Sequence, residues 1–277
     1  MLFSIVAFAS AVAAWSAPNL TSYNLVWQDD FCGDAGLLPN DTNWNIVTNI
    51  SVNNEWQQYT THNTNLQVSG GDTLQIVPLL AENQWTSGRI ESKYTWAPAS
   101  GKKSIGEAVI RFGENAIDTK KGMWPAFWML SETCRTNGTW PECGEIDILE
   151  TVNGHLTGYG TVHCDTYPGG LCHEPTGIQS TIEIPNQSWH RWRLVVDRTS
   201  GNWRTETLQW YMDNTLFQTI TGAQIGDESV WSNLAHSAKY FILNVAVGGN
   251  WPGATNNMTA DSWGSMMEVA YVAHYES

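Results

Sequence analysis

Residues 145–150 read Glu-Ile-Asp-Ile-Leu-Glu, and this stretch restricts the fold more than any other part of the chain. Its three carboxylates are separated by apolar side chains, which excludes a fully solvated acidic surface. Glu145 and Asp147 stand two positions apart, the spacing that places side chains on one face of a β-strand. The β-branched residues between them also favour a strand over a helix. The stretch therefore predicts a strand with acids on one face and apolar side chains buried behind it.

Glu150 does not fit a regular strand, because it follows Glu145 by five positions. An odd spacing would point its side chain to the opposite, apolar face. One extra residue, inserted as a β-bulge, restores the alignment. We place the bulge at Ile148–Leu149, where two apolar residues are consecutive. All three carboxylates would then project from the same face.

The rest of the chain predicts an all-β fold. Short runs of alternating or β-branched residues recur between Gly, Asn and Pro clusters, a pattern typical of a β-sandwich or barrel. No long helical period, repeat or linker interrupts them, and residues 212–215 predict a hairpin turn. The predicted strands cover residues 23–27, 74–77, 89–93, 108–112, 145–150, 193–196, 208–212, 240–247 and 267–275.

The N-terminal residues 1–17 are predicted to be a secretory signal peptide. An apolar run follows Met1 and reaches Ala11-Val12-Ala13, a small-residue cleavage pattern, and the run is too short to span a bilayer. It lacks a preceding Lys or Arg, so a retained hydrophobic N-terminal strand is the alternative. We therefore expect a secreted, extracellular protein in which residues 18–277 form a single domain.

The composition argues against nucleic acid and membrane partners. The chain carries 27 Asp and Glu against 13 Lys and Arg, a net charge of −14, so phosphate backbones and anionic lipids would repel it. Its 16 tryptophans exceed what a core needs, and indoles stack well on flat, uncharged ligands. We expect a monomer whose ligand is neutral.

Five cysteines follow the predicted leader, and two pairs of them enclose short polar loops. We expect disulfides between Cys134 and Cys143 and between Cys164 and Cys172, which leaves Cys32 over. A zinc site is the alternative, but no C-x-x-C spacing occurs, and a secreted chain favours disulfides. N-glycosylation sequons, which also suit a secretory route, occur at Asn19, Asn40, Asn49, Asn137, Asn186 and Asn257.

Amides, an arginine and several indoles gather in segments outside the acidic strand. Residues 53–57 combine two Asn with Glu, Trp and Gln, and Arg89 follows a predicted tight turn. Trp124 and Trp128 stand four positions apart, and Trp251 follows two glycines. Amides and guanidinium groups hydrogen-bond hydroxyls, whereas indoles stack on pyranose rings. These segments predict a cleft for a sugar polymer.

The motifs GEIDILE, WTSGRIESK, GMWPAFWML and ILNVAVGGNWPG together resemble glycoside hydrolase family 16, in particular secreted, fungal-type laminarinase-like endo-β-1,3(4)-glucanases. The resemblance extends from about Trp27 to the last predicted strand. It implies a concanavalin A-like β-jelly-roll sandwich whose two curved sheets carry a concave substrate cleft. It also implies that residues 18–277 are a catalytic domain that cleaves with retention of configuration. The E-x-D-x-x-E spacing matches the bulged subgroup of that family.

A retaining glycosidase uses two carboxyl groups about 5–5.5 Å apart, one as nucleophile and one as acid and base. By match to the family motif, Glu145 would be the nucleophile, Glu150 the acid/base and Asp147 a support for Glu145. Crowded carboxylates in a partly dry cleft should raise the pKa of at least one of them, as the acid role requires. A calcium site or a buried structural cluster is the alternative for the three acids.

The resemblance also implies substrate-binding roles, each with a structural alternative. Trp124 and Trp128 would stack on sugars, unless either belongs to the core. Arg89 would bind hydroxyls together with Asn54, unless the arginine pairs with Glu91 or Glu55, and Glu55 itself would support the site or touch sugar. The other two candidates are His163, which could be a core histidine, and Trp251, which could be simple loop packing.

We expect no bound metal and no cofactor. Family members often carry calcium on the convex face, with an Asp ligand in the last strand, but Ala270 stands at the corresponding position. The favoured substrate is β-1,3-glucan or mixed β-1,3-1,4-glucan. An endo-β-1,3-galactanase or a glucan transglycosylase is the alternative with the same chemistry. A non-catalytic glucan-binding lectin is the alternative from another class.

Overall fold

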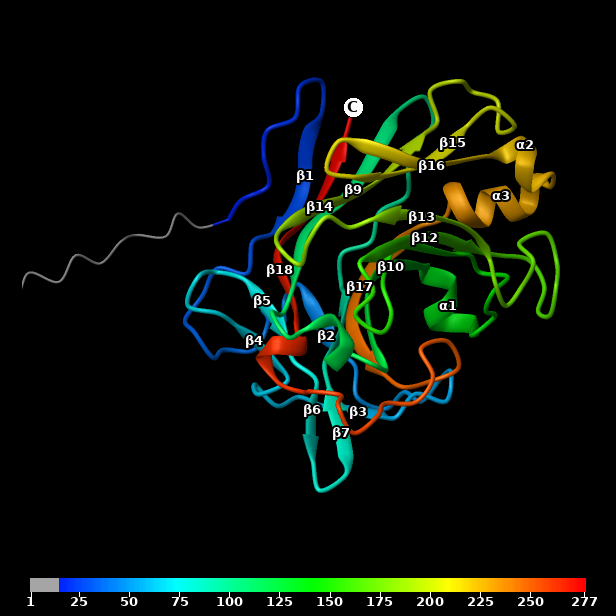
Figure 1. The fold of residues 1–277 in the computed structure, drawn as a ribbon. Coiled ribbons are helices and arrows are strands. Elements are labelled where there is room, and N and C mark those ends of the chain that lie inside the picture. Colours follow the sequence, from blue (N-terminus) through cyan, green and yellow to red (C-terminus); the bar gives the residue numbers. More distant parts are fainter. Residues whose placement is uncertain (1–14) are drawn as a thin grey trace, which may run out of the picture.

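The short alternating runs form strands, and the computed structural model describes residues 15–277 as a sandwich of two large antiparallel sheets (Figure 1). Every run named from the sequence contributes a strand, so the all-β prediction is confirmed. The predicted signal peptide falls largely on residues 1–14, which lie outside the described part of the chain. Trp15 packs on the outer sheet beside the buried Ala17, and a leader boundary at residue 17 stays a prediction.

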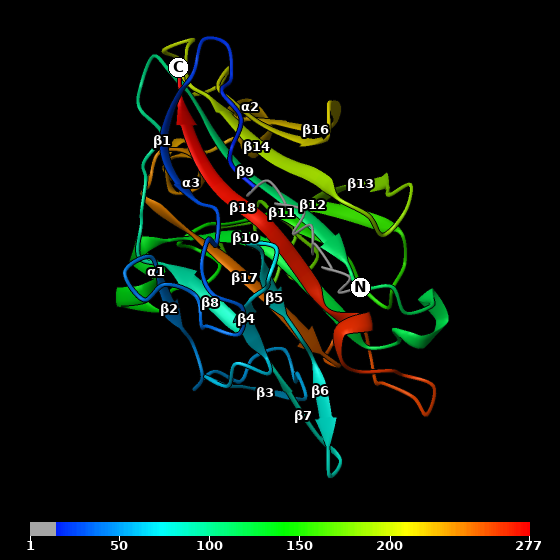
Figure 2. The same ribbon diagram turned by 90° about the vertical axis from the view of Figure 1, so that its left-hand side faces the viewer.

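One large sheet, here called the outer sheet, has eight strands. In chain order they are β1 (Asn24–Asp29), β4 (Leu66–Val68), β5 (Leu74–Ile76), β9 (Lys103–Phe112), β14 (His190–Asp197), β15 (Thr207–Met212), β16 (Thr215–Thr221) and β18 (Met267–Glu276). Their spatial order is β16-β15-β14-β9-β18-β5-β4, and β1 also pairs with β18. Figure 2 shows β18 crossing this sheet between β9 and β5. The predicted hairpin joins β15 to β16, with Asp213 at φ 54°.

The other large sheet has seven strands and is called the cleft sheet. In chain order they are β2 (Trp44–Ile46), β8 (Arg89–Ser92), β10 (Met123–Ser131), β11 (Glu145–Glu150), β12 (Thr157–His163), β13 (Ile178–Glu183) and β17 (Lys239–Val247). Their spatial order is β13-β12-β11-β10-β17-β8-β2, which places the acidic strand β11 near the middle.

Smaller elements complete the fold. A three-stranded sheet contains β3 (Gln57–Tyr59), β6 (Leu79–Ala81) and β7 (Gln84–Ser87). The helices are α1 (Glu132–Asn137), α2 (Gly222–Ile225) and α3 (Glu228–Ala235), with single 3₁₀ turns at Ile117–Thr119 and Trp263–Ser265. Within residues 15–277, no helix is long and apolar enough to cross a membrane.

The core lies between the two large sheets and is rich in indoles. Trp44, Trp192, Trp210 and Trp231 are fully buried there, so a share of the tryptophans serves packing instead of ligand binding. Burying a large side chain stabilises a fold by about 1.5–3 kcal/mol. Because the inner face of the cleft sheet is held by this core, its other face is free to carry polar side chains.

A proline lies inside β10, a central strand for which the sequence predicted no strand. Proline lacks a backbone N–H and is usually excluded from central strands. The paired residues of β10 and β11 end at Ala126 and Glu150, and Pro125 lies just beyond them. Its carbonyl oxygen still accepts a hydrogen bond from the backbone N–H of Thr151 at 3.3 Å. The missing N–H therefore falls where regular pairing with β11 has ended, while pairing with β17 continues through Val245.

Candidate active site

The acidic strand contains the bulge that its spacing predicts. On β10, Trp128 faces Asp147 and Phe127 faces Leu149, so Ile148 has no partner. The register between β11 and β12 shifts over the same residues. A bulge at Ile148–Leu149 is therefore confirmed, and its physical effect is to change the side-chain parity of everything that follows.

This change of parity separates acids from apolar side chains as expected. Ile148 and Leu149 are fully buried in the core, whereas Glu145, Asp147 and Glu150 line one cavity of about 300 Å³ on the opposite face of the cleft sheet. The other residues lining this cavity are Ile50, Val52, Asn53, Glu55, Arg89, Trp124, Ala126, Trp128, Leu130, Trp140, Asn244 and Ala246.

Glu145 is the most exposed of the three acids and has one hydrogen-bond donor and one ion-pair partner beside it. Nε1 of Trp140 donates to its Oε2 at 3.1 Å, and Nε2 of His163 lies 4.0 Å from its Oε1. Burial raises the pKa of Glu145, and the nearby His163 cation and the Trp140 N–H offset part of that rise. These two partners favour the ionised form that a nucleophile requires.

Glu150 lies at the other end of the strand, where it accepts a hydrogen bond from Nε1 of Trp124 at 2.8 Å. Burial raises the pKa of Glu150 to about 7; the Trp124 hydrogen bond opposes this rise and the charge of Glu145 adds to it. A carboxyl group with such a pKa holds a proton near neutral pH and can both donate and recover it.

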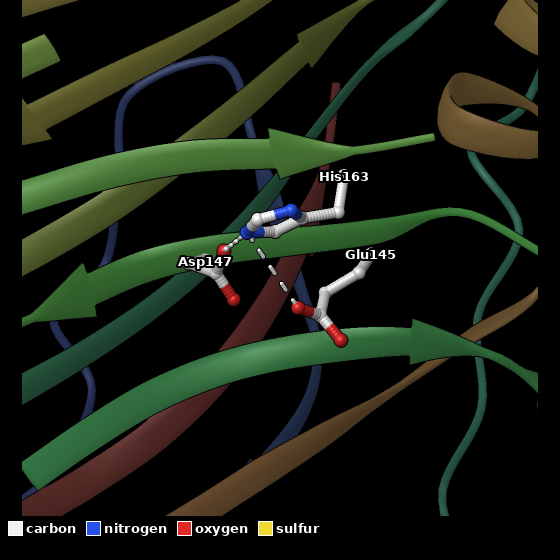
Figure 3. Close-up of side chains that lie close together, drawn as sticks. All are labelled: Glu145, Asp147 and His163. Carbon is white, nitrogen blue, oxygen red and sulfur yellow. Dashed lines mark ion pairs between the residues drawn. The ribbon is translucent and has the colours of Figure 1, made fainter. Parts of the chain in front are cut away.

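Asp147 and His163 lie beside Glu145, and Figure 3 shows the imidazole directed at both carboxyl groups. Nε2 of His163 is 3.5 Å from Oδ2 of Asp147, and no residue in the described part of the chain hydrogen-bonds that oxygen. Burial, followed by the charges of Glu150 and Glu145, raises the pKa of Asp147 well above its usual range. Burial alone would lower the pKa of His163, but its hydrogen bond to Glu174 and the charge of Glu145 raise it to about 9.

Among the described residues, Glu145, Asp147 and His163 are the group whose side chains are close enough together to share a metal ion. Each offers one atom, and the three atoms lie within 4.8 Å of one another. A metal needs a deprotonated nitrogen from histidine. Nδ1 of His163 is bonded to Glu174, and its Nε2 lies 3.5 Å from Asp147 and 4.0 Å from Glu145, the geometry of an ion-pair cluster. Ala270 is buried among apolar side chains of the outer sheet.

Trp128 and Arg89 form one wall of the cavity. Nε1 of Trp128 donates to Asn244 at 2.8 Å, and the Arg89 guanidinium lies 4.9 Å from the centre of the Trp128 ring. Arg89 also forms the anticipated ion pair with Glu91, at 2.7 Å, and is only 5% exposed. Arg89 lines the cavity, so contact between its guanidinium and a sugar stays a prediction. The ion pair with Glu91 holds the guanidinium in place.

Asn54 and Trp251 do not line the cavity. Nδ2 of Asn54, in an exposed loop, donates a hydrogen bond to Oδ1 of Asn250 at 2.7 Å. One of its two N–H groups is therefore already bonded within the protein. Trp251 packs edge-on against Trp124 and Tyr159, with ring centres 5.5 and 4.9 Å apart, and remains 40% exposed. Sugar contacts by either residue stay predictions for the rim.

Comparison with known proteins identifies this arrangement. Residues 82–190 match the family model described as the XgeA-like catalytic domain of glycoside hydrolase family 16. An endo-1,3-β-glucanase from Streptomyces sioyaensis is 34% identical in sequence and superimposes with a TM-score of 0.89, covering 94% of this chain and 99% of that one. The chain belongs to glycoside hydrolase family 16. The family resemblance and the jelly-roll fold predicted from the sequence are thus confirmed.

Two curated relatives show the range of substrates near this family 16 chain. The keratan-sulfate endo-1,4-β-galactosidase of Sphingobacterium multivorum is 28% identical over 263 residues, covering 92% of this chain and 56% of that protein. The glucan endo-1,3-β-glucosidase A1 of Niallia circulans is 28% identical over 290 residues, covering 94% of this chain and 39% of that protein. The chain spans about half the length of these curated relatives.

Both predicted disulfides of the family 16 domain are present, and they flank the acidic strand. Cys134–Cys143 closes the loop that carries Trp140, and Cys164–Cys172 closes a loop that begins directly after His163. In the described chain Cys32 is unpaired and exposed. The two disulfide pairings predicted from the short loops are confirmed.

The sequence reasoning missed several residues of this family 16 site. Trp140 and Asn244 were not singled out, although an indole in the short loop before β11 was a usable signal. Glu174, which bonds His163, carries no sequence signal because it lies 24 positions beyond the last acid of the strand. Its position follows only from the folded loop.

Proposed function

We propose that the protein is an endo-acting, retaining hydrolase of β-1,3-glucan or mixed β-1,3-1,4-glucan. The observation that carries this proposal is that Glu145 and Glu150 line one cavity from a single bulged strand. Two carboxyl groups with different surroundings can divide the acid and nucleophile roles between them. The indoles of Trp124, Trp128 and Trp140 supply apolar walls suited to pyranose rings.

The proposed reaction has two displacement steps. Glu145 attacks the anomeric carbon while Glu150 gives its proton to the departing glycosidic oxygen, and a glycosyl ester forms on Glu145. Glu150, now a carboxylate, takes a proton from water, which attacks the same carbon and frees Glu145. His163, as a cation, stabilises the charge of Glu145 before and after the reaction.

We also propose that the enzyme is secreted and acts as a monomer. The predicted leader and the two disulfides support secretion, because disulfides persist in oxidising compartments. A β-galactan is a second candidate substrate, since one relative is named as an endo-1,4-β-galactosidase. The intact acidic trio and the raised pKa of Glu150 favour catalysis over lectin activity.

Product analysis on laminarin, mixed-linkage glucan and β-1,3-galactan tests this proposal. We expect a rapid rise in reducing ends with short oligosaccharides from laminarin, because an endo-acting enzyme cleaves internal bonds. Proton NMR should show the β-anomer first, since two inversions retain configuration. Longer products than substrates would indicate transglycosylation, and release from galactan alone would replace glucan by galactan. Lack of any cleavage would reject the proposal.

The alkaline limb of kcat/KM should lie near pH 7. Glu150 must be protonated to act as an acid, and its pKa is about 7, so activity falls as pH rises through that value. The measurement is kcat/KM on laminarin across the acid and alkaline range. An activated aryl glycoside provides the control, because its leaving group needs no proton and the limb should flatten. A limb that is equally steep for both substrates would assign the titration to another group.

A further inference from the structure

Glu174 is a buried carboxylate that touches the active site only through a histidine. Its side chain is fully covered, and its Oε2 lies 2.7 Å from Nδ1 of His163. The residue belongs to none of the four sequence motifs that mark the family. A buried carboxylate is costly unless it is paired, so this contact requires a physical reason.

The loop that carries Glu174 holds the carboxylate in one orientation. Oε1 accepts a hydrogen bond from the backbone N–H of Cys164 at 3.0 Å, so the two oxygens have different partners. The backbone of Glu174 exchanges hydrogen bonds with Gly169 at 2.9 and 2.6 Å. The disulfide between Cys164 and Cys172 anchors the preceding part of this loop and ends two residues before Glu174. The carboxylate therefore has little freedom to leave His163.

The other nitrogen of His163 faces the catalytic strand. Nε2 lies 3.5 Å from Oδ2 of Asp147 and 4.0 Å from Oε1 of Glu145. The charges that raise the pKa of this imidazole are Glu174 on one side and Glu145 and Glu150 on the other, and the carboxyl group of Asp147 faces the same nitrogen as Glu145. All are acids, and together they favour an imidazolium that donates from both nitrogens.

We propose that Glu174 is a positioning residue: it holds His163 as a cation whose Nε2 points at Glu145 and Asp147, and thereby sets the pH range in which Glu145 is ionised. This inference rests on the proposed function, in which Glu145 must be ionised. The raised pKa of His163 agrees with this geometry. Glu174 touches no reacting atom and acts through the imidazole; its own charge raises the pKa of Glu145 by less than the His163 cation lowers it.

Removing the charge of Glu174 should therefore change the pH profile in a defined way. Without the charge of Glu174, His163 is held less firmly and loses its proton at lower pH, so it stabilises the carboxylate of Glu145 less. This loss exceeds the relief of the weaker repulsion between Glu174 and Glu145, and the acid limb of kcat/KM moves to higher pH by up to about one unit. The alkaline limb, which is set by Glu150, moves up less than the acid limb, because His163 lowers the pKa of Glu150 less than that of Glu145. The bell narrows and its maximum shifts toward alkaline pH.

The kinetic test compares three variants with the wild type. Glu174→Gln keeps the shape and an oxygen for the Cys164 N–H, and should show the shifted acid limb. Glu174→Asp retains the charge and should restore part of the wild-type profile. Glu206→Gln is the matched control. Glu206 is also a buried carboxylate, 3% exposed, and its Oε2 lies 2.5 Å from Nε2 of His236, but neither residue lines the cavity. A structural role alone would lower kcat in Glu174→Gln without moving either limb, and that outcome overturns the proposal.

An NMR titration of His163 tests the same inference without substrate. In the wild type the imidazole should stay protonated through neutral pH, with a pKa of about 9. In Glu174→Gln the pKa should fall by at least about one unit; an unchanged value rejects the inference even if laminarin is cleaved. Failure to cleave any glucan would reject the proposed function and leave the NMR result to decide the role of Glu174. If the Gln variant does not fold, Glu174→Asp decides, with a smaller shift in the same direction expected and no shift overturning the inference.

Discussion

Replacing Glu145 by Gln should lower kcat on laminarin by about 10⁴-fold or more, because the amide cannot form the glycosyl ester through which the reaction passes. The change is nearly isosteric, so the fold should survive. Oε1 and Oε2 of Glu145 contact His163 and Trp140, and an amide can still accept the Trp140 hydrogen bond. Initial rates with laminarin, together with circular dichroism and thermal unfolding, measure the two effects separately.

The control for this prediction is Glu142→Gln. Glu142 is exposed in the loop before β11, and we assign it no role in the reaction, so its loss of charge should leave kcat within about twofold. Azide gives a second check on Glu145→Ala, because a small anion can attack from the vacated side in a single displacement and yield an α-glycosyl azide from an activated substrate. Retention of a tenth or more of wild-type activity by Glu145→Gln would sink the nucleophile assignment.

Replacing Glu150 by Ala should lower kcat/KM on laminarin by about 10²–10⁴-fold, the usual contribution of a general acid. A sugar alkoxide is a poor leaving group and needs a proton as the bond breaks. An aryl glycoside with an acidic phenol does not, so its first step should slow little. The diagnostic quantity is the ratio of the two losses, obtained from steady-state and burst kinetics on the same protein preparation.

Azide separates the role of Glu150 from that of Glu145. In Glu150→Ala the glycosyl ester on Glu145 still forms, and azide attacks it without needing a base. The product should be a β-glycosyl azide, the opposite anomer to that expected from Glu145→Ala. Trp124→Phe is a milder change next to Glu150 than Glu150→Ala, because it removes only the N–H that bonds Glu150 and keeps an aromatic ring. If the two Ala variants yielded the anomers in the reverse order, the roles would be exchanged.

Local pattern predicted the positions of many strands along the chain correctly, but not those of all strands. Runs such as residues 240–247 form strands because alternation and β-branching act over a few neighbours. β10 escaped prediction because Pro125 argues against a central strand, and its tolerance depends on where β11 stops pairing. The excess of tryptophans was read as a binding surface, yet Trp192 and Trp210 are fully buried. Composition counts indoles but cannot tell which face of a sheet each one occupies.

What the sequence determined by itself is the acidic strand: three carboxylates, the bulge at Ile148–Leu149 and the shared face. These follow from spacing along one strand, where side-chain direction depends only on parity. Only the tertiary structure decided which groups surround those acids. Trp140 and Glu174 reach Glu145 and His163 from two separate loops. One disulfide encloses Trp140, and the other ends two residues before Glu174. Such contacts depend on how loops close over the sheet, and no local period encodes that.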